Sequence, residues 1–74
     1  MTTEELKKYA LRTLIEEHLW KVGESDSFTY NNTKYKLEKT SDGFALIRND
    51  KVMSFNTRMS RIFSELFRRN NISY

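Results

Sequence analysis

The stretch KYKLEKTSDGFALI, residues 34–47, decides the fold. Its first half alternates charged residues with Tyr35 and Leu37, as is typical of a strand with one buried face. Ser41-Asp42-Gly43 then predicts a turn. The run Phe44-Ala45-Leu46-Ile47 is apolar on both faces and indicates a central strand. The stretch therefore predicts an antiparallel hairpin.

Shorter strand signals flank this hairpin on both sides. Phe28-Thr29-Tyr30 alternates, and Asn31-Asn32 follows it with residues that tolerate the positive φ of a two-residue turn. On the other side, Asn49-Asp50 predicts a turn into Val52-Met53-Ser54-Phe55. Residues 27–55 therefore predict an antiparallel meander of three or four strands.

Helical signals bracket the meander. Residues 1–22 predict a helix that opens with a capping box of Thr2 and Glu5 and stops at Gly23. The second helix begins after Asn56, a good N-cap, and ends at Asn70-Asn71. Its apolar residues recur at helical spacing: Met59, Ile62, Phe63, Leu66 and Phe67.

The fold class predicted from these signals is α+β, with the order helix, three- to four-stranded antiparallel meander, helix. We expect both helices on one face of the sheet. The chain of 74 residues is short enough for one small domain, 1–74, with a marginal core. It has no Cys and no apolar run near the roughly 20 residues that span a bilayer. Without a secretory signal at the start, we expect a cytoplasmic protein with no membrane partner.

All of the excess positive charge lies in the last part of the chain. Residues 1–56 carry nine Lys/Arg and nine Asp/Glu, whereas residues 57–74 carry four Arg and only Glu65. The four arginines are Arg58, Arg61, Arg68 and Arg69. On the helical wheel all four can reach solvent while the apolar stripe stays buried.

This cluster predicts a small basic regulatory or accessory protein that binds nucleic acid through its C-terminal helix, because a guanidinium matches phosphate geometry. We add Lys34 and Lys36 of the second strand to this nucleic-acid-binding set, provided that they face the same way. An ordinary solvated face is the alternative. Arg68 and Arg69 complement the helix dipole there, and Arg61 pairs with Glu65.

The first helix carries two apolar stripes. One consists of Leu11, Leu14, Ile15, His18 and Val22, and the other of Leu6, Tyr9, Ala10, Thr13 and Trp20. We expect the sheet to cover the first stripe and the second helix to cover the second. The alternative function follows if that packing fails. The protein is then an interaction module, an inhibitor or adaptor, that uses Leu6, Tyr9 and Trp20 together with the Arg face against an acidic protein partner. A symmetric homodimer is the commonest form of such an interface.

Chemistry for catalysis is missing from these patterns. His18 is the only histidine, and we expect it at the core or its boundary, with no nucleophile or acid at a useful spacing. We therefore expect no catalytic residues, metal site or cofactor, and no enzyme. A small ribonuclease built from Arg, Lys, Tyr and Glu is the third alternative.

The order helix, strands, helix resembles the double-stranded-RNA-binding domain, which recognises the shape of an RNA duplex. The resemblance is one of topology. That family opens its second helix with adjacent lysines, and the matching stretch here is Ser54-Phe55-Asn56-Thr57-Arg58-Met59. No residue role is carried over from it.

Overall fold

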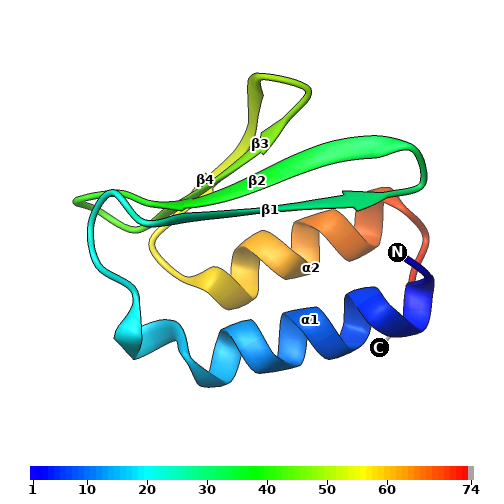
Figure 1. Cartoon of the computed structure of the whole chain (residues 1–74), viewed down its shortest axis with the longest axis horizontal. Coiled ribbons are helices and arrows are strands. Elements are labelled where there is room, and N and C mark those ends of the chain that lie inside the picture. Colours follow the sequence, from blue (N-terminus) through cyan, green and yellow to red (C-terminus); the bar gives the residue numbers. More distant parts are fainter. Residues whose placement is uncertain (74) are drawn as a thin grey trace.

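Four antiparallel strands form one sheet, and two helices lie together beneath it in the computed structural model (Figure 1), which describes residues 1–73. The strands follow the chain order, so the sheet is a meander with β1 and β4 at its edges. The predicted α+β class, the strand number and the placement of both helices on one face are confirmed. The elements are α1 (Thr3–Ile15), a 3-10 turn η1 (Glu17–Leu19), β1 (Ser25–Tyr30), β2 (Thr33–Lys39), β3 (Phe44–Arg48), β4 (Lys51–Asn56) and α2 (Met59–Arg69).

Asparagine and aspartate make the tight turns, as predicted. Asn31 and Asn32 have φ of 53° and 59°, and Asn49 and Asp50 have φ of 48° and 68°. Two consecutive left-handed residues match the right-handed twist of a two-residue hairpin. The longer turn at residues 40–43 joins β2 to β3, and the Thr40 hydroxyl accepts a hydrogen bond from the Gly43 amide at 3.0 Å.

The first helix begins as predicted and ends early. Thr2 and Glu5 form the reciprocal capping box, but α1 stops at Ile15, well before Gly23. The chain has to return to the sheet. The Gly23 amide already donates to the Lys39 carbonyl at 2.9 Å, which extends the β1–β2 ladder, so the chain has left the helix layer by that residue.

The start of α2 also differs from the prediction. Asn56 is the last residue of β4, and Arg58 takes the N-cap position without a side-chain capping bond. The Asn56 side chain still acts locally, because its Oδ1 accepts a hydrogen bond from the Arg58 amide at 3.1 Å. This Asx turn redirects the chain from the sheet into the helix layer.

One core fills the space between the sheet and the helices. Tyr9 of α1 contacts both neighbours, with ring centroids 4.8 Å from Phe28 of β1 and 6.1 Å from Phe63 of α2. The buried hydrophobic cluster comprises Leu6, Tyr9, Ala10, Phe28, Tyr35, Leu37, Phe44, Leu46, Met59, Ile62, Phe63, Leu66 and Phe67.

A single stripe of α1 therefore meets both α2 and the sheet. Leu6, Tyr9, Ala10 and Thr13 are buried. Of the other stripe, which we expected under the sheet, Leu14 is half-buried against the core, and the rest face solvent instead: Leu11, Ile15, His18 and Val22. The prediction was wrong because both helices lie side by side in one layer, so α2 and β1 approach α1 from the same side.

Candidate nucleic-acid interface

The arginines of α2 lie on the side of the helix that faces solvent, because the apolar residues on its other side are buried in the core. Met59, Ile62, Phe63 and Leu66 have no exposed surface. Arg58, Arg61, Arg68 and Arg69 are all exposed, and together we call them the Arg surface. The structure thus places three of the four predicted arginines on α2 and Arg58 at its N-cap, with all four side chains exposed.

Arg61 and Arg68 border a shallow hollow between α2 and the edge strand β4. The hollow has a volume of about 350 Å³, and Ser54, Asn56, Ser64 and Glu65 complete its lining. β4 has no strand on its outer side, so its edge is open. Hydroxyl, amide and guanidinium groups lie together beside this edge. Groups of these kinds contact phosphate in protein–nucleic acid complexes.

Glu65 divides the Arg surface into two parts. It accepts a hydrogen bond from the Arg69 Nε at 2.8 Å and pairs with the Arg68 guanidinium. Hydrogen bonds from Arg69 and then Arg68 lower the pKa of the Glu65 carboxyl. Arg58 and Arg61, by contrast, make no ion pair within residues 1–73, so the predicted Arg61–Glu65 pair is not formed.

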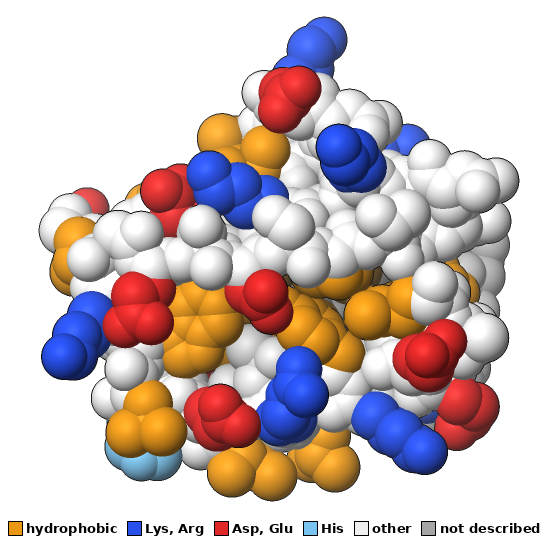
Figure 2. Space-filling view, viewed as in Figure 1, with side chains coloured by type: hydrophobic (Ala, Val, Ile, Leu, Met, Phe, Trp, Pro, Cys, Tyr) orange, Lys and Arg blue, Asp and Glu red, His pale blue; other side chains and the backbone are white. Residues whose placement is uncertain are grey.

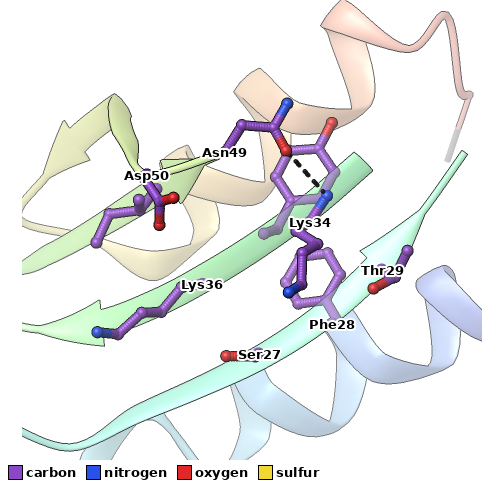
Figure 3. A pocket seen from close by; sticks show the side chains of 9 residues that line it. Ser27, Phe28, Thr29, Lys34, Lys36, Asn49 and Asp50 are labelled. Atoms are coloured by element: carbon purple, nitrogen blue, oxygen red, sulfur yellow. Dashed lines mark hydrogen bonds between the residues drawn. The ribbon is translucent and has the colours of Figure 1, made fainter. Parts of the chain in front are cut away.

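Lys34 and Lys36 lie on the opposite face of the sheet from α2. They alternate along β2 with Tyr35 and Leu37, which are buried towards the helices. Figure 3 shows both lysines beside another shallow hollow, about 370 Å³ in volume, that Asp50 also lines. The two lysines therefore do not extend the Arg surface.

The residues expected at a protein interface belong to the fold. Leu6 is fully buried and Tyr9 is 7% exposed. Trp20 is half-buried and packs edge-on against Phe44, with ring centroids 6.1 Å apart. Leu6 and Tyr9 are not available to a partner in this structure, because α2 and β1 already cover them.

Two exposed apolar groups were not recognised as surfaces in the sequence. On α1 and the segment after it, Leu11, Ile15, Leu19 and Val22 are each more than 60% exposed. On the open face of the sheet, Val52 and Phe55 are 66% and 55% exposed. Leu11, Ile15 and Val22 were visible as part of a stripe that was assigned to the sheet, whereas Leu19 belonged to neither stripe. The β4 pair carried no signal, because alternation places residues three apart on opposite faces.

A β-bulge brings Val52 and Phe55 to the same face. Val52 pairs with Ile47, and Ser54 pairs with Leu46, so Met53 is the extra residue on β4. Such a bulge reverses the alternation of the strand. It is a feature of pairing between strands, and it cannot be read from β4 alone.

Other chemistry in the described chain is sparse. His18 is exposed on η1, not at the core boundary as expected. Among residues 1–73, no three His, Cys, Asp or Glu side chains gather as they would around a metal ion. No helix in that part of the chain has the length and apolar character to cross a bilayer.

Comparison of the chain with protein-family models, with curated proteins and with solved structures yields no match.

Proposed function

We propose that this protein binds nucleic acid by contacting phosphates with the Arg surface of α2. The observation that carries the proposal is the pair Arg61 and Arg68, which border one hollow together with four further residues: Ser54, Asn56, Ser64 and Glu65. Arg61 and Arg68 are seven residues apart, which is about 10 Å along a helix. That spacing separates the two guanidinium groups enough for them to contact different phosphates of one nucleic-acid backbone.

The contacts proposed here position the protein without reading sequence. Phosphate oxygens are the same at every base, so binding through them is strong at low salt and weak in sequence preference. Arg58 and Arg61 have no intramolecular ion pair within residues 1–73 to break on binding. Arg68 and Arg69 would have to share their guanidinium groups with Glu65 or leave it. We therefore assign the larger share of binding to Arg58 and Arg61. A regulatory or accessory role fits a module that binds nucleic acid without sequence preference.

The test is fluorescence anisotropy of labelled single- and double-stranded DNA and RNA across a salt series. The variant Arg61→Ala/Arg68→Ala should bind more weakly than wild type on every sequence. The slope of log K against log salt should become shallower by about 0.7–0.9 for each phosphate that the variant no longer neutralises.

A matched control removes the same charge from the other face of the sheet. Lys34→Ala/Lys36→Ala lowers the net charge equally and should leave affinity and salt slope close to wild type. Equal losses for the two double variants would show a net-charge effect and contradict the assignment to α2. Absence of binding at low salt, where attraction is strongest, would end the nucleic-acid proposal.

A second candidate, an acidic protein partner, is favoured by the unpaired edge of β4 beside Arg61 and Arg68. An extended peptide can add to such an edge through its backbone, while arginines read its carboxylates. Labelled polyglutamate in the same salt series separates the two functions. Binding of that peptide together with no binding of any nucleic acid would favour the protein partner.

A further inference from the structure

A row of aliphatic side chains runs along the outer side of α1 and continues past its end. Leu11 is 62% exposed, Ile15 65%, Leu19 61% and Val22 66%; we call these four residues the outer row. Single exposed aliphatic residues are ordinary, but a contiguous row marks an interaction surface. Figure 2 shows hydrophobic side chains on the lower rim of the molecule, which is the side of α1 that faces away from the sheet.

Nothing within residues 1–73 covers the outer row. The inner side of α1 holds Leu6, Tyr9, Ala10 and Thr13, and both α2 and the sheet lie on that side. The row therefore adds nothing to the stability of the single chain, and a chain of this size has few aliphatic residues to spare.

The charges beside the row indicate what covers it. Acids occupy the first turn of α1 and the two residues that follow it, whereas the cations of α1 lie between these acids, two in the middle of the helix and Arg12 in its last turn; Lys21 follows further along the chain. The cations are Lys7, Lys8 and Arg12, and the acids are Glu4, Glu5, Glu16 and Glu17. A membrane surface or a nucleic acid would favour a basic flank. A flank that carries both signs can pair with a second copy of itself, because in an antiparallel arrangement the cations of one helix can face the acids of the other.

We propose that the outer row is the interface of a symmetric homodimer in which two α1 helices pack antiparallel. A two-fold axis between Leu11 and Ile15 sets Leu11 of each copy against Ile15 of the second copy. Lys8 then lies at the level of His18 of the second copy. Glu16, the C-cap of α1 in that copy, is two residues nearer the two-fold axis, so the geometry sets Lys8 and Glu16 of opposite copies at neighbouring levels.

The proposed interface is small, which determines how it should behave. Stable complexes bury about 1,200–2,000 Å² in total, and a single pair of short helices falls towards or below that range. The dimer should therefore form and dissociate with concentration in the micromolar range. The dimer interface uses α1, whereas the proposed nucleic-acid site uses α2. Either proposal can therefore be disproved while the other stands.

Sedimentation velocity across a concentration series tests the proposal on the full chain. Leu11→Gln/Ile15→Gln should raise the dimer dissociation constant by at least about tenfold. Both side chains are exposed, so far-ultraviolet circular dichroism and the melting midpoint of the monomer should hardly change. Val52→Gln is the matched control, because Val52 is as exposed as Ile15 but lies on the open face of the sheet.

A charge exchange tests the antiparallel geometry. Lys8→Glu and Glu16→Lys should each weaken the dimer, and the double variant Lys8→Glu/Glu16→Lys should recover it. A chain that is monomeric at all concentrations would overturn the proposal, including a monomer that binds anionic vesicles. A dimer that dissociates with Val52→Gln but persists with Leu11→Gln/Ile15→Gln would overturn it too, and would place the interface on the sheet.

Discussion

At the scale of single residues, Gly43 shows how closely the turn before β3 approaches the end of β4. A Cβ at this position would lie 2.3 Å from the Asn56 carbonyl oxygen and 2.6 Å from the Thr57 Cα. Both are backbone atoms, so no side chain can move aside. We expect Gly43→Ala to lower the free energy of unfolding by about 2–4 kcal/mol, measured by urea denaturation.

Gly23→Ala is the control for this prediction, because it isolates the effect of backbone conformation. Gly23 has a φ of 93°, but a Cβ there would meet nothing within 4 Å. An alanine should cost only about 1–2 kcal/mol for the left-handed conformation. An equal or smaller loss for Gly43→Ala than for Gly23→Ala would show that the close approach to β4 relaxes easily.

At the scale of the element, α2 ends in a Schellman motif built around Asn71. The Ile72 amide donates to the Phe67 carbonyl at 2.9 Å, the Asn71 amide donates to the Arg68 carbonyl at 3.2 Å, and Asn71 has a φ of 55°. Glycine has no steric penalty at that φ. We expect Asn71→Gly to raise the free energy of unfolding and Asn71→Ala to lower it, each by about 0.5–1 kcal/mol. The melting midpoint should shift in the same direction.

Asn70 provides the comparison within the same turn. It has a φ of −103°, and its side-chain amide donates to the Leu66 carbonyl at 2.9 Å. Asn70→Gly should therefore destabilise the helix end, opposite in sign to Asn71→Gly. A gain in stability from both glycines would argue against a specific left-handed position at residue 71. Circular dichroism during thermal unfolding measures all three variants.

At the scale of the whole molecule, Tyr9 joins the helix layer to the sheet. Its ring packs on Phe28 and Phe63, and its hydroxyl donates a hydrogen bond to Asp26 Oδ2 at 2.9 Å. Burial raises the pKa of the Tyr9 hydroxyl above its ordinary value, and the hydrogen bond to Asp26 raises it further. The folded state therefore holds the Tyr9 proton more tightly than the unfolded state.

That difference makes stability depend on pH in alkaline solution. Below about pH 10, the ordinary tyrosine pKa, Tyr9 is protonated in both states and its stabilising contribution is complete. Above it, the unfolded state loses the proton first, so the free energy of unfolding falls as pH rises. Urea denaturation between pH 8 and pH 11 should show a steeper fall for wild type than for Tyr9→Phe. Parallel curves would mean that folding does not raise the pKa of the Tyr9 hydroxyl.

Much of this arrangement could be predicted from local chemistry. The alternation in β2 depends on neighbouring residues, as do the left-handed Asn and Asp turns and the apolar spacing of α2. The Arg surface follows for the same reason, because burial of one face of α2 leaves its other face to the arginines. The end of α1 at Ile15 was missed, because residues 16–23 lead back to the sheet, where the Gly23 amide donates to the Lys39 carbonyl, a residue distant in sequence.

The sequence by itself determined the element order, the turns and the four exposed arginines, since each rests on interactions within a few residues. Only the tertiary structure decided which stripe of α1 is buried, because two apolar stripes of similar character compete and the positions of α2 and β1 choose between them. It also decided that Lys34 and Lys36 face away from α2, and that a bulge brings Val52 and Phe55 to one face. These outcomes depend on contacts between residues distant in sequence, which no local pattern encodes.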